Sequence, residues 1–176
     1  MLQVSLRDSR SVRTDRAWIE GVYRDYLNDL APSATGIFPA LGEVGHREPD
    51  QLQRWFGDPT AQVLTILYNE SPVGFAMVRR RSAPSSASAS SAPAPEFSMA
   101  EFFIARAWRR RGIGAEAVRL LFDRFAGQWL ISEHVRNTTA VKFWRRVVAA
   151  YTHGKYQERI LDGEVQQHFE SGPQRR

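Results

Sequence analysis

The residues best suited to bind a charged ligand lie in one short segment, Arg109-Arg110-Arg111-Gly112-Ile113-Gly114. An apolar run precedes the segment and an amphipathic pattern follows it, which predicts a turn from a strand into a helix. The first amides of a helix lack intrahelical partners and carry partial positive charge from the helix dipole. Glycines let a bulky anion approach the backbone, and the arginines attract it. The segment therefore predicts a phosphate-binding turn; the alternative is a tight turn whose arginines are only solvated.

Two common phosphate-binding motifs do not fit this turn. No Gly-Lys-Ser/Thr follows the glycines, which excludes a P-loop. The third glycine of a dinucleotide-binding G-x-G-x-x-G pattern would fall at Ala117. The type of phosphate ligand must therefore be argued from the sequence around the turn.

Glu101 is the titratable residue of the strand that leads into the turn. Strand alternation puts Glu101 and Phe103 on one face and Phe102 and Ile104 on the other. A carboxylate in a central strand costs free energy unless it has a partner or a function. Glu101 is thus either a residue that acts on the substrate or the partner of a nearby arginine in a salt bridge.

A metal site is not expected. The chain has no cysteine, and its histidines do not follow the spacing of metal ligands. The histidines are His46, His134, His153 and His168.

Hydrophobic periodicity and turn residues predict the elements that precede the turn. The first helix is expected to be capped by Asp15, to place Trp18, Val22, Tyr26 and Leu30 along one stripe, and to end at Pro32. The other expected elements, in chain order, are a strand from Leu2 to Arg7, a helix from Pro49 or Asp50 to Phe56, a hairpin of Gln62–Tyr68 and Val73–Arg79 around Asn69-Glu70-Ser71, and a strand from Phe97 to Ile104.

The sequence after the turn predicts two helices and three strands. The first helix carries Val118, Leu121, Phe122 and Phe125 and is closed by Gly127. A strand follows at Gln128–Glu133, and Asn137 is a good N-cap for the second helix. That helix has an apolar stripe of Ala140, Phe143, Trp144, Val147, Val148 and Tyr151 and stops at Gly154. Tyr156–Leu161 and Val165–Phe169 flank the turn residues Asp162-Gly163, and residues 171–176 read as a polar tail. The order of elements predicts an α/β fold with a central sheet covered by helices.

Length and composition point to one domain. The 176 residues suit a single domain, and 43% of them are apolar. Residues 82–95 contain only Ser, Ala and Pro, so we expect a flexible loop inserted between neighbouring strands. No apolar run approaches the roughly 18 residues that a membrane span needs, and the N-terminus lacks a signal pattern. We therefore expect a cytoplasmic protein without a membrane partner.

The net charge of +5 favours anionic partners. All but two of the 24 basic residues are arginine, so the alternative is that the charge reflects genome base composition. A nucleic-acid-binding domain is the less favoured reading, because the sequence has no signature of such a domain and its arginines are scattered.

The sequence FFIARAWRRRGIGA at residues 102–115 resembles the acyl-CoA pyrophosphate motif of the GNAT acetyltransferase superfamily, Arg/Gln-x-x-Gly-x-Gly/Ala. Downstream, NTTAVKFW at residues 137–144 resembles the next motif of that superfamily, Asn-x-x-Ala with an aromatic residue four positions later. The specific resemblance covers about residues 97–151. It implies a single GNAT domain over residues 1–176, with a mixed central sheet of six to seven strands and about four flanking helices.

The resemblance also implies acetyl-CoA as the cofactor and a set of residues that bind it. Backbone amides from Arg110 to Ala115 would hold the pyrophosphate, and the backbone of Phe103 to Arg106 would bond the pantetheine arm. Asn137 would contact the cofactor near its pantetheine end, or act only as an N-cap. The full set of expected cofactor-binding residues is Phe103, Ile104, Ala105, Arg106, Arg109, Arg110, Arg111, Gly112, Ile113, Gly114, Ala115, Asn137, Phe143 and Trp144.

For catalysis, the resemblance implies direct attack of an amine on the thioester. Carboxylates at the position of Glu101 bind or deprotonate the amine in relatives. Many relatives carry a tyrosine seven residues after the Asn, which protonates the leaving thiolate, but this chain has Trp144 there. Tyr151 stands about 10 Å further along the helix and is no obvious substitute.

Two functional readings follow from the resemblance. The first is an N-acetyltransferase that acts on a small-molecule or protein amine. The second is a non-catalytic acyl-CoA-binding domain of the same fold, which the missing tyrosine keeps open. Dimers are common in the family, so a homodimer is among the expected assemblies. The aromatic residues expected near the acceptor, each also a core candidate, are Trp18, Tyr23, Tyr26, Phe38, Trp55 and Phe56.

Overall fold

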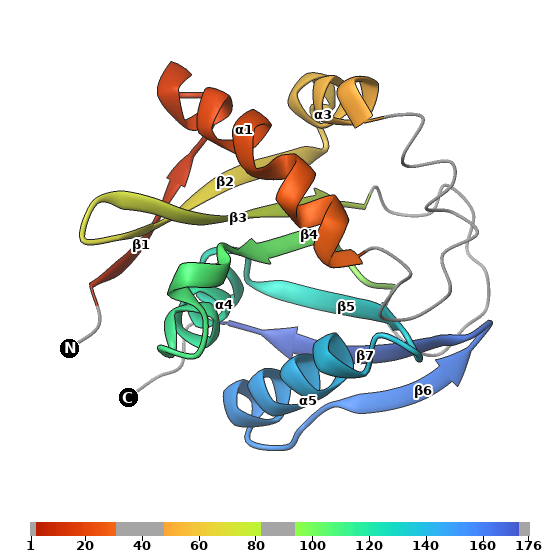
Figure 1. Ribbon diagram of the computed structural model, residues 1–176. Helices are drawn as coiled ribbons and strands as arrows, with labels where there is room; N and C mark the ends of the chain where they lie inside the picture. Colours follow the sequence, from red (N-terminus) through yellow and green to blue (C-terminus); the bar gives the residue numbers. More distant parts are fainter. Residues whose placement is uncertain (1–2, 31–47, 82–93, 173–176) are drawn as a thin grey trace. The chain divides into compact units, whose positions relative to one another are not determined.

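The computed structural model describes residues 3–30, 48–81 and 94–172. These residues form seven strands, four α-helices and one short 3-10 helix (Figure 1). In chain order the elements are β1 (Val4–Asp8), α1 (Arg13–Leu30), α3 (Glu48–Gly57), β2 (Ala61–Tyr68), β3 (Ser71–Arg80), β4 (Phe97–Ile104), η1 (Arg106–Trp108), α4 (Ile113–Arg124), β5 (Gly127–His134), α5 (Thr138–Thr152), β6 (Gln157–Leu161) and β7 (Glu164–Ser171). The order confirms the predicted α/β class.

Hydrogen bonding places the strands in one sheet in the order β1-β2-β3-β4-β5-β7-β6. The sheet is mixed, because β4 and β5 run parallel whereas β1 with β2, and β7 with both β5 and β6, run antiparallel. The two predicted hairpins are confirmed. The turns at Asn69-Glu70 and Asp162-Gly163 both have two positive φ angles, as type I′ hairpin turns require.

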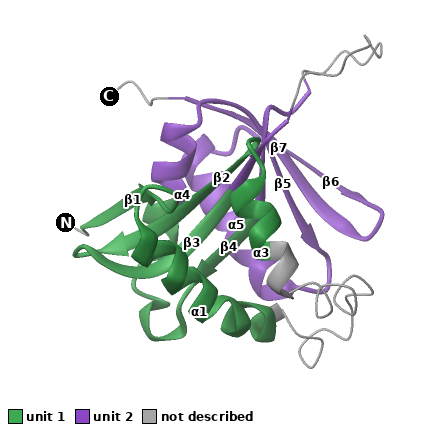
Figure 2. Ribbon diagram, turned by 90° about the horizontal axis from the view of Figure 1, so that it is seen from above, with its two compact units in different colours: residues 1–77, 101–117 green, residues 78–100, 118–176 purple. Residues whose placement is uncertain are grey.

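The chain divides into two compact units (Figure 2). Unit 1 comprises residues 1–77 and 101–117, and unit 2 comprises residues 78–100 and 118–176. The strands β3 and β4 and the helix α4 each contribute residues to both units. The single domain over residues 1–176 stays a prediction, and most of the Ser/Ala/Pro tract lies outside the described residues.

In unit 1, the first helix differs from the predicted one at its start. The helix begins at Arg13, so Asp15 lies in its first turn and is not the N-cap. Asp15 is 1% exposed and its carboxylate pairs with Arg7 of β1, with an Nη2–Oδ1 distance of 2.6 Å. The buried stripe continues through Ile19 and Tyr23 rather than through Trp18 and Val22, which are only half-buried. The ion pair to β1 therefore sets the rotation of the helix, which local capping signals could not show.

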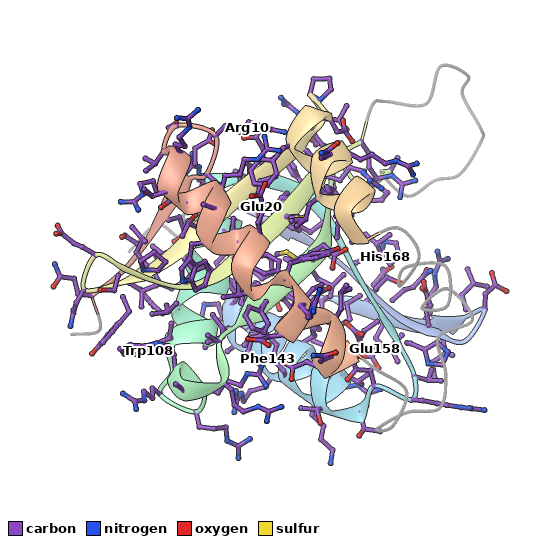
Figure 3. All side chains as sticks on the ribbon, turned by 45° about the horizontal axis from the view of Figure 1, so that its top comes forward. Arg10, Glu20, Trp108, Phe143, Glu158 and His168 are labelled. Atoms are coloured by element: carbon purple, nitrogen blue, oxygen red, sulfur yellow. The ribbon has the colours of Figure 1, made fainter. Side chains whose placement is uncertain are left out.

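The second helix of unit 1 is tied to the strand that follows it by Arg10, labelled in Figure 3. The guanidinium of Arg10 donates to four backbone carbonyls at and beyond the end of α3, those of Trp55, Phe56, Asp58 and Ala61. These bonds satisfy carbonyls that a helix C-terminus leaves without partners. They fix the connection from α3 to β2.

In unit 2, aromatic side chains form the core. Phe122 of α4 packs edge-on against Trp129 and Phe169, each at 4.9 Å between ring centroids. Two predicted boundaries need correction, because Gly127 begins β5 instead of closing the helix, and Phe125 lies just beyond α4. The predicted polar tail is also wrong at its first residue. Ser171 belongs to β7, is 5% exposed, and donates its hydroxyl to the Phe125 carbonyl.

Candidate active site

The predicted phosphate-binding turn lies in unit 1, between η1 and α4 (Figure 1). Arg110 and Gly112 both have positive φ, 64° and 80°, which turns successive backbone amides toward a common side. The Glu116 amide bonds to the Gly112 carbonyl at 3.1 Å, so the amides of residues 113–115 stand before it at the start of the helix. Arg110, Arg111 and Gly112 are exposed. The turn thus presents amides, a helix N-terminus and two exposed arginines together.

Arg109 is oriented differently from the two exposed arginines. Its Nε–H donates to the Ile104 carbonyl at 2.7 Å, and its guanidinium pairs with Asp29 of α1 and lies 5.5 Å from the Phe103 ring centroid. Asp29 also pairs with Arg106 at 3.2 Å. The Arg109 side chain therefore fixes the shape of the turn by joining it to β4 and to the end of α1. Its predicted contact with the cofactor stays a prediction.

The first residues of β4 pair with β5. The parallel register contains two pairs, Phe97 with Trp129 and Ser98 with Leu130, and no further pair in the described residues. On the β3 side, the Ala105 amide donates to the Val73 carbonyl at 2.8 Å. The predicted bonding of a pantetheine arm by the backbone of Phe103–Arg106 stays a prediction.

Gly74 of β3 lies unusually close to Phe103 and Ile104 of β4. A Cβ at Gly74 would stand 2.3 Å from the Phe103 carbonyl oxygen and 2.8 Å from Ile104 Cδ1. Real Cβ atoms do not approach backbone so closely, so the position requires glycine. No local sequence pattern indicates this role, because it depends on the neighbouring strand.

Glu101 is half-buried and accepts a hydrogen bond from the hydroxyl of Tyr26 of α1. Tyr26 is 7% exposed, and its ring packs edge-on against Phe75 at 5.3 Å and Phe103 at 5.8 Å. Glu101 and Phe103 thus both contact Tyr26, which confirms the predicted strand face. The arrangement is a carboxylate held by a phenol among aromatic rings. The sequence suggested Tyr26 only as one of several aromatic candidates.

Asn137 has two roles in unit 2. Its Oδ1 accepts from the Ala140 amide at 3.3 Å, which confirms the predicted N-cap of α5. Its Nδ2 donates to Glu133 Oε1 of β5 at 2.9 Å. Trp144, also on α5, is 5% exposed and its side chain donates to Glu133. Phe143 is half-buried and meets the Trp144 ring edge-on at 5.2 Å. Two of the predicted cofactor-binding residues, Asn137 and Trp144, therefore donate to a carboxylate that the sequence did not single out.

Glu133 has an unusual pKa for a glutamate. Burial raises the pKa of Glu133 from 4.5 to about 7, and the negative charge of Glu164 on β7 adds to the rise. The hydrogen bonds from Asn137 and Trp144 oppose it but do not cancel it. The sequence held a signal for this residue. Glu133 shares the alternation of Trp129 and Ile131, which places it on the buried face of β5.

Tyr151 is not a substitute for the missing tyrosine. Its hydroxyl lies 2.8 Å from Asp123 Oδ1 and 3.0 Å from the Gly172 carbonyl oxygen. Burial, followed by the bond to Asp123, raises the pKa of Tyr151 to about 12. A phenol with that pKa and those partners is a structural group of the unit 2 core, in line with the sequence interpretation.

The remaining predicted residues add no further site. Among residues 3–30, 48–81 and 94–172, no group of His, Asp and Glu side chains is arranged to hold a metal ion. Of the aromatic acceptor candidates, Tyr23, Tyr26 and Trp55 are buried, Trp18 and Phe56 are half-buried, and Phe38 lies outside the described residues. No helix in the described part of the chain has both the length and the apolar character needed to cross a membrane.

Comparison with known proteins decides the family. The sequence matches the acetyltransferase (GNAT) family over residues 23–148, which is more than half of its length. The chain belongs to the GNAT acetyltransferases. The predictions of an acetyltransferase, and of acetyl-CoA as the cofactor that GNAT enzymes use, are thereby confirmed.

Solved structures show the same GNAT fold at low sequence identity. A GNAT-family acetyltransferase from Streptococcus agalactiae has a TM-score of 0.70 at 12% identity, with 99% of both chains covered. The N-acetyltransferase PaiA of Thermoplasma acidophilum, in complex with coenzyme A, has a TM-score of 0.58 at 11% identity, covering 96% of this chain and 99% of its own. The aminoglycoside acetyltransferase AAC(6')-Ib, also with coenzyme A, has a TM-score of 0.55 at 17% identity, covering 96% and 95%. No curated protein sequence matches the chain.

Proposed function

We propose that the chain transfers the acetyl group of acetyl-CoA to a primary amine of a small molecule or a protein, by direct attack of the amine on the thioester. The observation that carries the proposal is the turn at the start of α4. Backbone amides there precede the first helical hydrogen bond, and two exposed arginines lie beside them. This is the donor set that a diphosphate needs. These residues of the chain therefore support acetyl-CoA, the cofactor of the family, as the ligand of the turn.

The chain's residues fit the cofactor in two further places. The backbone of Phe103–Arg106 would bond the pantetheine arm. Asn137, Phe143 and Trp144 would contact the same arm from the start of α5. Acetyl-CoA supplies an activated acyl carbon to the bound amine. Arg109 contributes through the turn, because its guanidinium is already bound to Ile104 and Asp29.

Glu101 is the residue that would receive the amine. Its carboxylate would accept a hydrogen bond from an N–H of the neutral amine, beside the bond from Tyr26. It would then take the one proton that the amine loses as its nitrogen bonds to the acyl carbon. The rings of Tyr26, Phe75 and Phe103 limit the motion of the carboxylate.

Thiol release from acetyl-CoA, measured over a panel of primary amines, tests this function. The panel should contain an alkyl diamine, an aminoglycoside and a peptide with a free α-amino group. We expect turnover with at least one amine. Glu101→Gln should lower kcat/KM for that amine at least 100-fold, as expected for loss of a general base, with unchanged affinity for coenzyme A.

A different outcome would favour the alternative reading. Tight binding of coenzyme A without turnover on any amine would indicate an acyl-CoA-binding domain. The predictions of one domain over the whole chain, of a cytoplasmic location, of a homodimer and of no nucleic-acid partner remain proposals alongside this function.

A further inference from the structure

We propose that Arg111 recognises the 3′-phosphate of coenzyme A, and that Trp108 and Tyr68 hold its guanidinium in place. This role rests on the proposed function, in which the amides at the start of α4 hold the diphosphate of the same cofactor. The three side chains belong to unit 1, as the turn itself does. Arg111 would thus determine which form of the cofactor the chain prefers.

The guanidinium of Arg111 lies over an aromatic ring. Its Cζ is 5.2 Å from the ring centroid of Trp108, which belongs to η1 and is labelled in Figure 3. The half-buried Trp108 packs in turn against Tyr68, the last residue of β2, with 5.5 Å between the ring centroids. A cation over the face of a ring is attracted by the negative charge of that face. The Arg111 side chain is therefore directed toward η1 and the end of β2.

The charge of Arg111 is available to a ligand. Arg111 is exposed, and no acidic side chain among residues 3–30, 48–81 and 94–172 forms an ion pair with it. Arg109 differs, because Asp29 already pairs with it. Contact with a ring needs none of the five N–H donors of a guanidinium, so two of them can bond two oxygens of one phosphate. Because the ring already restricts the side chain, less freedom is lost when the ligand binds.

Coenzyme A carries phosphate at two places that such an arginine could bind. Its diphosphate joins the pantetheine arm to a ribose, and that ribose bears the 3′-phosphate. The amides at the start of α4 are the donors expected for the diphosphate, and Arg111 stands two residues before the first of them, that of Ile113. The 3′-phosphate is a monoester, which carries roughly 1.5 to 2 negative charges near pH 7. An exposed arginine beside the amides therefore suits the 3′-phosphate, the more highly charged phosphorus of the two places.

Calorimetry with coenzyme A and 3′-dephospho-coenzyme A tests the proposal without requiring an acceptor. The two ligands share the diphosphate, the adenosine and the pantetheine arm, and differ only in the 3′-phosphate. We expect the wild-type protein to bind coenzyme A about 10- to 30-fold more tightly, the effect of a hydrogen-bonded charge pair near the surface. Arg111→Gln should abolish this preference, because it weakens the binding of coenzyme A far more than that of the dephospho form.

Further variants separate this role from a purely structural one. Trp108→Leu removes the ring under the guanidinium, so it should reduce the preference for coenzyme A, and Trp108→Phe should restore it. A change in folding alone would weaken both ligands equally and leave their affinity ratio unchanged. The matched control is Arg16 of α1, an exposed arginine whose guanidinium lies 4.6 Å from the ring centroid of Phe56. Arg16→Gln should leave both affinities unchanged.

The outcomes are distinct. If Arg111→Gln weakens both ligands equally, Arg111 binds the diphosphate, and its role at the 3′-phosphate is overturned while the proposed function stands. Equal affinity of the wild-type protein for the two ligands would also overturn that role. An unchanged affinity ratio in Trp108→Leu would overturn the positioning of Arg111 by Trp108. Absence of binding of either ligand to the wild-type protein would overturn the proposed function as well.

Discussion

Glu101 and Glu133 are the same side chain on two successive strands of the chain, β4 and β5, in different surroundings. In unit 1, Glu101 is half-buried and accepts a hydrogen bond from the hydroxyl of Tyr26, whose ring packs against Phe103. In unit 2, Glu133 receives an amide and an indole hydrogen bond, and burial together with the charge of Glu164 raises its pKa to about 7. The surroundings of a glutamate therefore decide how readily it ionises. Burial and a like charge hold the pKa of Glu133 near 7, whereas Glu101 is the carboxylate that the proposed function assigns to the amine.

The largest expected effect concerns the turn at the start of α4, on which the proposed cofactor binding depends. Gly112→Asp should weaken coenzyme A binding on the order of 100-fold or more, because it puts a negative charge where the diphosphate is expected. Gly112→Asn is the matched control, since it has nearly the same shape and also tolerates the φ of 80°. Calorimetry of the two variants gives the comparison. Equal losses would show that shape matters and charge does not.

The next effect follows from the pKa of Glu133. Because the folded pKa is about 7 and the ordinary value is 4.5, the folded state binds the extra proton between these pH values. The contribution of this proton to the free energy of unfolding is fully present below pH 4.5 and is lost as the pH rises through 7. The loss amounts to about 3 kcal/mol. The difference in unfolding free energy between Glu133→Gln and wild type should therefore grow in favour of the variant from pH 5 to pH 8. A difference independent of pH would contradict the distinction between the two carboxylates.

A smaller effect concerns the strand that carries Glu101. Gly74→Ala should lower the free energy of unfolding by about 1–3 kcal/mol, because the new Cβ would overlap the Phe103 carbonyl. It should also weaken coenzyme A binding by displacing β4. Gly21→Ala is the control, since its Cβ meets nothing within 4 Å and alanine favours the α1 helix. Thermal unfolding should give opposite signs for the two variants.

The smallest effect tests what holds Glu101. Tyr26→Phe should raise KM for the amine about 5-fold, the cost of one hydrogen bond, with coenzyme A affinity unchanged. Tyr23→Phe is a control from the same helix face. Steady-state kinetics on the amine that turns over would compare them. If both variants behave alike, Tyr26 has no particular role in positioning Glu101.

The sequence predicted those parts of the fold whose signals are local. The strand Phe97–Ile104, the Asn137 cap and the two hairpin turns appear in the structure because each depends on a few neighbouring residues. The parts it missed depend on residues distant in the chain. Tyr26 donates to Glu101, which lies 75 positions away in the sequence, and Arg109 donates to Asp29, which lies 80 positions away.

The misplaced start of α1 has the same origin. Asp15 is a good capping residue by type, but its carboxylate is bound to Arg7 of β1 instead. The alternation of Glu133 with Trp129 and Ile131 was readable in the sequence, but its raised pKa comes from burial and from the charge of Glu164 on β7, which the sequence does not show. Local propensity carries no information on such tertiary contacts.

The most direct test of a diphosphate site at the start of α4 follows the backbone amides of Ile113, Gly114 and Ala115 by NMR while coenzyme A or pantetheine is added. We expect large shifts of these three amides with coenzyme A and none with pantetheine, which lacks the diphosphate. Amides at the start of α4 that respond to neither ligand, although coenzyme A binds, would contradict it.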